Sequence, residues 1–237
     1  MTRDYRAELL DDARDTAVYH ADVEQGSLQW LERRLGIITA SEMKLLLTPT
    51  GKPAENDKAR AHLYELAAQR ITGHIEPAYI SDDMLRGQVD EIYASEVYAK
   101  HYAPVTEVGF ITNDRWGFTL GYSPDGLVGD DGLIECKSRR ARFQVETILS
   151  GEVPTEYMAQ LQTALLVTGR EWIDFISYSG GLPMFVRRVE PDQEWQDRIA
   201  AAALAAEIRI AAMVNEFADL SRGMIPTERR IEQEMIL

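Results

Sequence analysis

The chain has 237 residues, of which 45% are hydrophobic, enough to bury the core of one large domain. Its formal net charge of −14 argues against broad, nonspecific binding to nucleic acid, because affinity for phosphate backbones comes largely from Lys and Arg. A nuclease is still allowed, since positive potential can be confined to a narrow channel or to bound metal, and an ordinary solvated surface also fits the charge. The single cysteine, Cys136, excludes a disulfide framework and a four-cysteine zinc or iron–sulfur site within one chain.

The N-terminus has no apolar signal core, and no run of about 18 apolar residues occurs. We therefore expect a soluble, cytoplasmic protein that needs no membrane. No internal repeat, low-complexity tract or linker divides the chain. We expect one domain over residues 1–237, with an N-terminal helical segment and a long C-terminal helix.

The N-terminal region is predicted to be helical. Residues 3–22 have the composition of a surface helix, and Ser27 can cap a shorter helix that carries Trp30 and stops at Gly36. A further helix is predicted to open at Thr39-Ala-Ser41, with Ser41 as its N-cap.

Arg34 and Ser41 are candidates for a phosphate site, because a hydroxyl at a helix N-terminus near an arginine suits a phosphate group. An ordinary cap plus a surface arginine explains the same two residues, and spacing alone favours this simpler interpretation. A Pro/Gly loop follows at residues 48–56, in which Lys52 could touch DNA.

Two helices are predicted in the middle of the chain. Residues 57–71 form an amphipathic helix before Gly73, and the next helix runs from Asp82 to His101. The second helix has an apolar stripe of Leu85, Val89, Ile92, Tyr93 and Val97. Glu91 lies off this stripe, so periodicity alone predicts that it is solvated.

From Pro104 the pattern changes to strands and crossover helices. An antiparallel meander is predicted over residues 105–112, 117–122 and the segment up to 138; helices follow at 141–149 and 155–168, strands at 172–178 and 184–189, and a long helix from Pro191. A helix that crosses over between strands is typical of an α/β fold.

Two short strands within this region carry the strongest chemical signal. A period of two puts Glu135 and Lys137 on one face of the strand Leu133–Ser138. Asp125 lies ten residues before Glu135, between a Ser-Pro and a Gly that favour a turn or extended geometry. A turn through residues 129–132 would bring the strands together, so that Asp125 and Glu135 could share a divalent metal.

The spacing of Asp125, Glu135 and Lys137 is the pattern of the PD-(D/E)XK nuclease superfamily. Over about residues 23–190 the chain closely resembles the λ exonuclease, or YqaJ-type viral recombinase, family. The residues that carry this resemblance are Val23–Gly26, Trp30, Arg34–Ser41, Gly87, Gln88, Glu91, Ser123–Leu127, Glu135–Lys137 and Tyr157–Gln162. The fold implied by the resemblance is a restriction-endonuclease-like α/β core, with a central mixed β-sheet flanked by helices.

The resemblance implies a magnesium-dependent, processive 5′-to-3′ exonuclease on linear double-stranded DNA. Its product would be a 3′ single-stranded tail for a single-strand annealing protein, and its assembly a homotrimer ring around DNA in a bacterial or phage-infected cell. Hydrolysis of a phosphodiester must activate water and stabilise a leaving oxygen. Two Mg²⁺ ions roughly 4 Å apart can do both, and Mn²⁺ can substitute.

The resemblance also implies roles for single residues. Asp125, Glu135, the main-chain carbonyl of Cys136 and the side chain of Glu91 would hold the metal, and Lys137 would sit beside the attacking water. Arg34 and Ser41 would bind the 5′ phosphate.

Two further residues match the family pattern less tightly. Asp114 resembles a second acidic residue of the family site, although its distance to Asp125 in the sequence matches loosely. Gln160 matches a glutamine near the site, and a polar residue on a helix flank explains it equally well. The loop of residues 48–52 lacks an arginine that the family has there.

Two alternative functions stay open. An endonuclease of the same fold would cut a closed circle, and a Cas4-like member is disfavoured by the single cysteine. A catalytically silent subunit that binds DNA ends would show no magnesium-dependent degradation, but it would have little reason to retain Asp125, Glu135 and Lys137.

Overall fold

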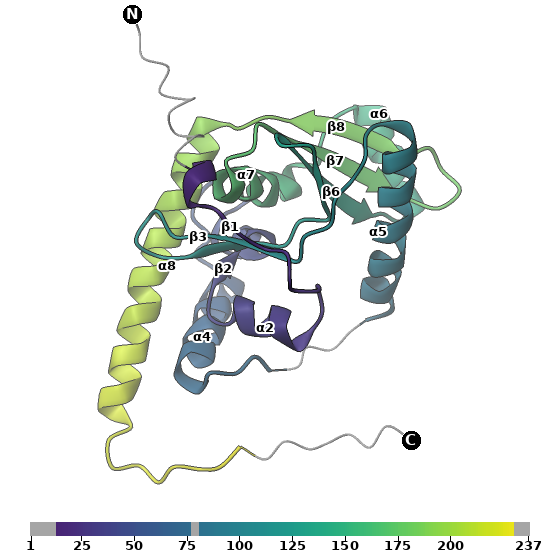
Figure 1. Ribbon diagram of the computed structural model, residues 1–237. Helices are drawn as coiled ribbons and strands as arrows, with labels where there is room; N and C mark the ends of the chain where they lie inside the picture. Colours follow the sequence, from purple (N-terminus) through teal and green to yellow (C-terminus); the bar gives the residue numbers. More distant parts are fainter. Residues whose placement is uncertain (1–12, 77–80, 230–237) are drawn as a thin grey trace, which may run out of the picture.

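Two four-stranded sheets form the framework of the computed structural model, which describes residues 13–76 and 81–229 (Figure 1). The first sheet has the order β1-β3-β4-β2, with β1 at Val18–His20, β3 at Phe110–Asn113, β4 at Leu120–Tyr122 and β2 at Ile38–Thr39. The second has the order β5-β6-β7-β8, with β5 at Gly126–Val128, β6 at Gly132–Ser138, β7 at Trp172–Tyr178 and β8 at Phe185–Val189. Both sheets are mixed, because β2 pairs parallel with β4 and β6 pairs parallel with β7.

The mixed α/β architecture agrees with the prediction, but the predicted meander is divided between the two sheets. β4 belongs to the first sheet and β5 to the second, and the chain passes from one to the other at residues 123–125. Pro124 lies at this crossing. Since proline has no N–H to donate to a ladder, it favours the end of a strand at this point.

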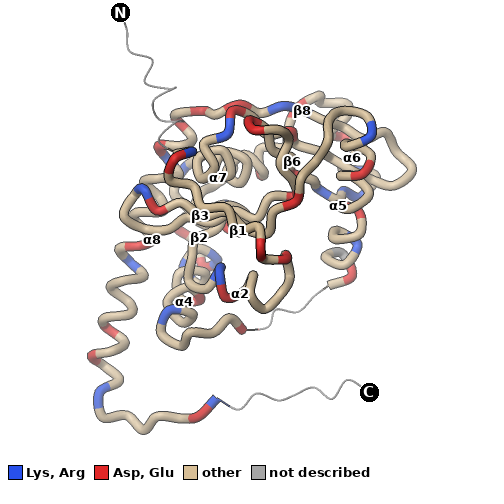
Figure 2. Tube along the Cα trace, viewed as in Figure 1, with Lys and Arg blue, Asp and Glu red and all other residues tan. Residues whose placement is uncertain are grey.

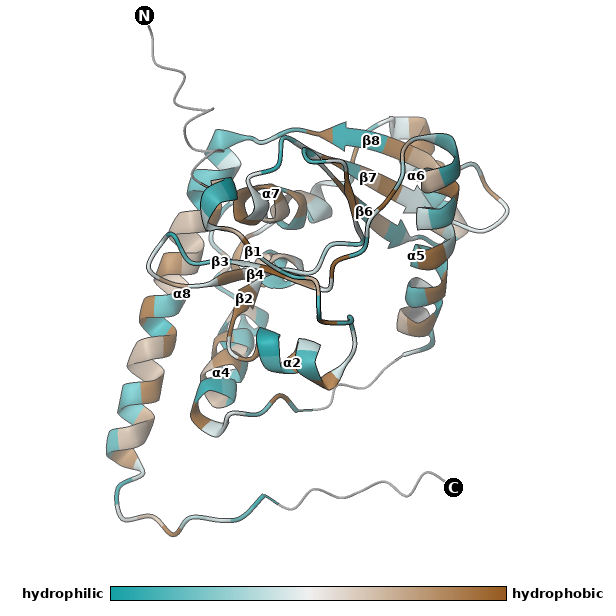
Figure 3. Ribbon diagram, viewed as in Figure 1, coloured by the Kyte–Doolittle hydropathy of each residue, from teal (hydrophilic) through white to brown (hydrophobic). Residues whose placement is uncertain are grey.

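One helix, α7 (Met158–Thr168), is buried on every side. All residues from Ala159 to Thr168 are buried, and α7 contacts β3 and β4 of the first sheet and β7 of the second. Its colouring is mostly apolar (Figure 3). A helix that is apolar all round has core on both sides, so α7 links the two sheets into one interior.

The remaining helices cover the outside of this framework. They are α2 (Leu28–Arg34), α3 (Met43–Leu46), α4 (Asp57–Thr72), α5 (Asp82–His101), α6 (Ala141–Ser150) and α8 (Gln193–Leu220), with 3₁₀ turns at Ala40–Glu42 and Thr155–Tyr157. α4 packs on α8, and Arg70 joins them through two hydrogen bonds to Glu207, of 2.7 and 2.6 Å. The far end of α8 extends beyond the sheets (Figure 1). No helix in the described ranges is long and apolar enough to cross a bilayer.

Several predicted helix boundaries are confirmed by their caps. The Ser27 hydroxyl accepts a hydrogen bond from the Trp30 N–H at 3.2 Å, and Gly73 ends α4 with φ of 63°. α5 spans Asp82–His101 as predicted, behind the capping residue Ser81. These boundaries follow from local rules that need no distant contact.

The prediction for the N-terminal region is partly wrong. Residues 18–20 form β1 instead of a helix, and residues 3–12 lie outside the described ranges. Ser41 lies inside the 3₁₀ turn and is not an N-cap. The reason is tertiary, because β2 pairs with β4 and holds Ile38 and Thr39 extended immediately before that turn.

The predicted buried face of α5 is also wrong. Leu85, Val89, Ile92 and Tyr93 are exposed, and the helix instead buries Ala94 and Tyr98 against the second sheet. The Tyr98 hydroxyl donates to the buried carboxylate of Asp174 at 2.6 Å. This hydrogen bond and the packing of Ala94 turn the opposite face of the helix, including the Glu91 position, inward.

A glycine substitution tests the packing that brings the N-terminal region onto the first sheet. A Cβ on Gly109 would lie 1.7 Å from the carbonyl oxygen of Val23, whereas a Cβ on Gly87 in α5 meets nothing within 4 Å. We expect Gly109→Ala to lower the free energy of unfolding by about 2–4 kcal/mol, because backbone atoms must move. The control Gly87→Ala should raise it by about 0.5–1 kcal/mol. Urea denaturation measures both, and a Gly109→Ala variant as stable as the parent would contradict the packing.

Candidate active site

The β5–β6 hairpin brings Asp125 and Glu135 together. Gly126 pairs with Ile134, so Asp125 lies beside the next residue of β6, and its Oδ2 accepts a hydrogen bond of 2.5 Å from the Cys136 N–H. Lys137 shares a face with Glu135, and its Nζ donates to Glu135 Oε1 at 2.6 Å. The two carboxylates and the ammonium predicted from the sequence are therefore neighbours.

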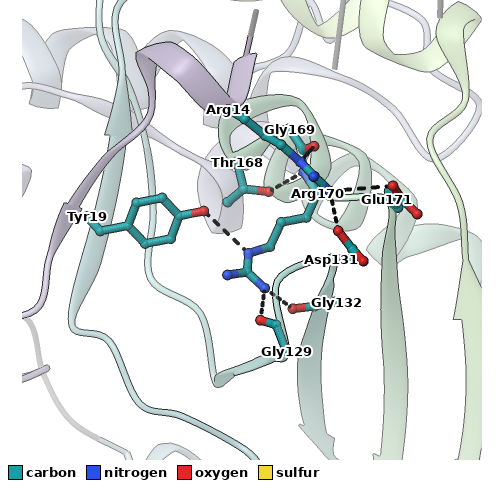
Figure 4. A network of polar contacts seen from close by, with 9 residues as sticks. All are labelled: Arg14, Tyr19, Gly129, Asp131, Gly132, Thr168, Gly169, Arg170 and Glu171. Atoms are coloured by element: carbon teal, nitrogen blue, oxygen red, sulfur yellow. Dashed lines mark hydrogen bonds and ion pairs between the residues drawn. The ribbon is translucent and has the colours of Figure 1, made fainter. Parts of the chain in front are cut away.

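The turn of this hairpin is held in place by residues from two distant segments (Figure 4). The buried Arg170 donates from Nη1 to the carbonyl oxygens of Gly129 at 2.9 Å and Gly132 at 2.7 Å, at the two ends of the turn. Arg14 pairs with the Asp131 carboxylate at 2.8 Å. These contacts fix the register, and a slip of one residue would turn Glu135 to the other face of the sheet.

Glu135 is the junction of the site. Its Oε2 accepts a hydrogen bond from the Tyr122 hydroxyl at 3.0 Å, and its Oε1 accepts one from Gln160 Nε2 at 2.5 Å in addition to that from Lys137. These donors come from β4, α7 and β6, and the Glu135 side chain is only 2% exposed. The structure thus places the predicted candidate Gln160 in direct contact with the site. It also adds Tyr122 to the site. The sequence carries no signal for this role, because an aromatic residue in a short β-prone segment is typical of an ordinary strand.

The site has more carboxylates than positively charged groups, since Asp125, Glu135 and Glu91 share one nearby lysine, Lys137. Burial raises the pKa of Asp125 well above its usual value, and Glu135 and Glu91 raise it further, while Lys137 and the Cys136 N–H lower it. Burial lowers the pKa of Lys137, but Glu135 and Asp125 outweigh this, so that the net shift is upward and the ammonium stays charged. One lysine does not neutralise the carboxylates, and a bound cation would reduce the repulsion between them.

Glu91 lies close enough to the other carboxylates to interact with them. It is half-buried on α5, so the prediction from periodicity that it is solvated is wrong. Burial raises the pKa of Glu91, and Glu135 and Asp90 raise it further against the effect of Lys137.

The donor set fits a hard divalent cation in part. Asp125 and Glu135 present carboxylate oxygens, which Mg²⁺ prefers, and a bound cation would offset the raised pKa of Asp125. Within residues 13–76 and 81–229, however, no three His, Cys, Asp or Glu side chains lie close enough together to hold a metal. Glu91 is therefore not assembled with Asp125 and Glu135 as a third side-chain ligand in this conformation.

Asp114 does not join the site. It lies exposed in the turn between β3 and β4, and the pairing of Asn113 with Leu120 puts this turn at the end of β4 opposite to Tyr122 and Asp125. A hairpin separates its turn from the outer ends of its strands, so the position of Asp114 gives no support to this weaker family match.

Arg34 and Ser41 meet in a second cluster next to the carboxylates. Arg34 donates to the Ser123 hydroxyl at 3.2 Å and to the Thr39 hydroxyl at 3.4 Å, and the Thr39 and Ser41 hydroxyls are 3.3 Å apart. Burial lowers the pKa of Arg34, which Glu42 opposes. Since Ser123 is two residues from Asp125, an anion bound by Arg34 would lie beside the carboxylate site.

Residues that the sequence reasoning gave no polar role hold this cluster in place. Trp30 donates from its ring N–H to the Ser123 hydroxyl at 2.9 Å, and its ring lies 4.3 Å from the Arg34 guanidinium carbon. Gln25 donates to the Pro124 carbonyl at 2.7 Å. Their presence in the pattern of the family resemblance was the available signal.

The raised pKa of Asp125 gives a stability prediction. A carboxyl whose folded-state pKa is raised stabilises the fold fully only below its unfolded pKa of about 4, and this stabilisation is lost as pH rises through the folded pKa. At pH 8 in EDTA, Asp125→Asn should therefore melt above the parent, by about 2–4 °C for each kcal/mol relieved. The difference should shrink toward pH 4.

The matched control is Asp114→Asn, which removes an exposed carboxylate and should leave the Tm unchanged. Calorimetry with and without Mg²⁺ measures the effect, and Mg²⁺ should raise the Tm of the parent more than that of Asp125→Asn. An Asp125→Asn protein that melts at or below the parent at pH 8 would contradict the electrostatic account.

The chain is similar to a known domain family and to several solved structures. Residues 29–171 match the YqaJ-like viral recombinase domain. The alkaline exonuclease LHK-Exo from Laribacter hongkongensis is 34% identical over 82% of this chain and 100% of that chain, with a TM-score of 0.69, and its complex with dAMP has the same identity and coverage with a TM-score of 0.70. A phage-related exonuclease from Haemophilus somnus 129PT shares the fold at 15% identity over 76% of this chain and 96% of its own, with a TM-score of 0.53.

No curated protein matches the chain in the corresponding sequence comparison. The family match covers more than half of the chain, and the relative at 34% identity is aligned over its full length. The chain therefore belongs to the YqaJ-like viral recombinase family and is a DNA exonuclease.

Proposed function

We propose that the protein is a Mg²⁺-dependent 5′-to-3′ exodeoxyribonuclease that degrades one strand of linear double-stranded DNA. The observation that carries the proposal is the contact of Lys137 with Glu135. Asp125 lies beside this pair, and the nearby carboxylates of Glu135 and Glu91 raise its pKa. The dAMP bound to the relative LHK-Exo supports a deoxynucleotide as product.

Asp125, Glu135 and the main-chain carbonyl of Cys136 would hold Mg²⁺, and Glu91 would contribute after a movement of its side chain from α5. Exonucleases of this family generally use divalent metal ions, and two Mg²⁺ ions, or Mn²⁺ in their place, suit these oxygen ligands. The chemistry that bound ions supply is activation of water and stabilisation of charge on the phosphate and leaving oxygen.

The protein's own side chains orient this chemistry. Tyr122 and Gln160 hold both oxygens of Glu135, which limits the directions its remaining lone pairs can take. Lys137 keeps a compact positive charge next to Glu135, where it can position the attacking water and stabilise the hydroxide that forms. This precise arrangement needs the strand face that Glu135 and Lys137 share.

Arg34 and Ser41 would bind the 5′ phosphate of the cleaved strand. Their cluster joins a guanidinium to the hydroxyls of Thr39, Ser41 and Ser123. Guanidinium and hydroxyl donors suit phosphate oxygens, and the position of Ser123 beside Asp125 would set the distance from the 5′ end to the cleaved bond.

The biological role would be the production of 3′ single-stranded tails for a single-strand annealing protein, in the cytoplasm of a bacterial or phage-infected cell. A closed homotrimer ring around DNA would make the enzyme processive, and closed cyclic symmetry is common among homo-oligomers.

An end-labelled DNA assay tests the central proposal. With Mg²⁺, linear duplex DNA should release a 5′ label before a 3′ label, and a covalently closed circle should stay intact. Lys137→Ala should lose about 10²–10⁴-fold in rate, the usual range for a residue that assists proton transfer, while it still binds DNA. Early 3′ release would reverse the polarity, cutting of the circle would favour an endonuclease, and no cleavage at all would favour a silent subunit.

The 5′ phosphate site makes a separate prediction. The parent should degrade 5′-phosphorylated DNA faster than the same DNA with a 5′ hydroxyl. Arg34→Ala should reduce this ratio to near one, because the guanidinium that distinguishes the two ends is gone. Single-turnover rates on both substrates measure the ratio, and Arg60→Ala, an exposed arginine on α4, is the control. A parent that degrades both substrates equally would contradict the assignment.

A further inference from the structure

We propose that the start of α6, with Arg139 and Arg142, forms a second phosphate subsite that binds a phosphodiester of the DNA strand next to the cleaved bond. This inference rests on the proposed exonuclease function and extends it with a site other than the Arg34 cluster. The ligand is a nucleic acid phosphodiester, and the partner is the DNA strand in the active site.

Arg139 is held in place by contacts with two neighbouring side chains. Its side chain is 9% exposed, and its Nη1 donates to the Tyr157 hydroxyl at 2.6 Å and to Glu156 Oε1 at 3.1 Å. Its Nε is buried and has no hydrogen-bond partner within the described part of the chain. Because this Nε is out of reach of a ligand, Arg139 serves the subsite as a fixed positive charge beside the Phe143 ring at the start of α6.

The first turn of α6 is built to favour an anion. Arg140 is the N-cap, no side chain caps the first amides, and the first turn contains no acidic residue. The helix has ten residues, so its N-terminus carries the partial positive charge of the free N–H groups. Phosphates bind at such ends when other donors converge there.

Two guanidinium groups pack against the same aromatic ring in this turn. The guanidinium carbon of Arg139 lies 5.0 Å from the centre of the Phe143 ring, and that of Arg142 lies 4.2 Å from it. Arg142 and Arg140 are exposed, so the cluster is open to a polymer. Glu156, which is 57% exposed, pairs with Arg139 and offsets part of this positive charge.

The cluster adjoins the catalytic lysine. Both cations contact the ring of Tyr157, whose centre is 5.7 Å from Lys137 Nζ and 5.4 Å from the Arg139 guanidinium carbon. A strand whose scissile phosphate lies at Lys137 can therefore place a neighbouring phosphate at Arg139. The chain has a net charge of −14, and acidic positions are spread along the trace in Figure 2, so Arg139, Arg140 and Arg142 form a local concentration of arginines in an acidic protein.

The first experiment measures DNA binding with Ca²⁺ in place of Mg²⁺, so that cleavage is prevented. Arg142→Gln should weaken Kd about three- to tenfold and reduce the slope of log K against log salt by about 0.9, the value for one phosphate contact. Arg222→Gln, which removes an exposed arginine beyond the end of α8, is the control and should leave both unchanged. Parent-like affinity and slope in Arg142→Gln would overturn the proposal.

A second experiment locates the contact. A single uncharged methylphosphonate linkage is moved along the cleaved strand, and Kd is measured at each position. For the parent, one position next to the cleaved bond should weaken binding, and this loss should disappear in Arg142→Gln. An equal loss in both proteins at every position would mean a general charge effect and would overturn the subsite.

Competition with inorganic phosphate distinguishes two possible ligands, a phosphodiester within a DNA strand and a free phosphate ion. If the subsite recognises a phosphodiester within a strand, millimolar phosphate should leave the affinity difference between parent and Arg142→Gln in place. Loss of that difference at low millimolar phosphate would mean a site for the free anion. Because binding is measured without cleavage, a failure of the end-labelled assay would reject the exonuclease proposal alone, and a failure here would reject the subsite alone.

Discussion

The carboxylate of Glu135 is the contact on which the site depends. It is buried on β6 and accepts hydrogen bonds from β4 through Tyr122 and from α7 through Gln160, while Lys137 pairs with it on its own strand. Because β4 and β6 belong to different sheets, this one side chain ties both sheets and the helix between them to a single point. A buried carboxylate is stable only with such partners, so the packing of the core and the chemistry of the site impose the same constraint.

The crossing between the sheets links the two parts of the proposed mechanism. Residues 123–125 carry the chain from β4 to β5, and their first residue, Ser123, accepts hydrogen bonds from Trp30 and Arg34. Their last residue, Asp125, accepts one from the backbone of β6. The phosphate cluster and the carboxylates are therefore connected by a short, anchored segment. Such a segment can keep a bound 5′ end at a constant distance from the cleaved bond.

The electrostatics explain how an acidic protein can act on DNA. The raised pKa values of Asp125 and Glu91 mark a local excess of negative charge that suits a metal cation. Positive groups adjoin this excess at two places, with Arg34 reaching it through Ser123 and Arg139 through Tyr157. Attraction for phosphate is thus concentrated beside the metal-binding carboxylates, while the rest of the charge disfavours binding elsewhere.

The sequence by itself determined the features that depend on neighbouring residues. A strand period of two placed Glu135 and Lys137 on one face, and caps such as Ser27 and Gly73 set helix ends, because these effects act within a few residues. The family pattern brought in Gln160. Only the tertiary structure decided that Tyr122 and Gln160 meet Glu135, that Asp114 lies away from the site, and which face of α5 is buried. These outcomes depend on hydrogen bonds and packing between residues far apart in the chain, such as Tyr98 with Asp174, and no local pattern encodes such partners.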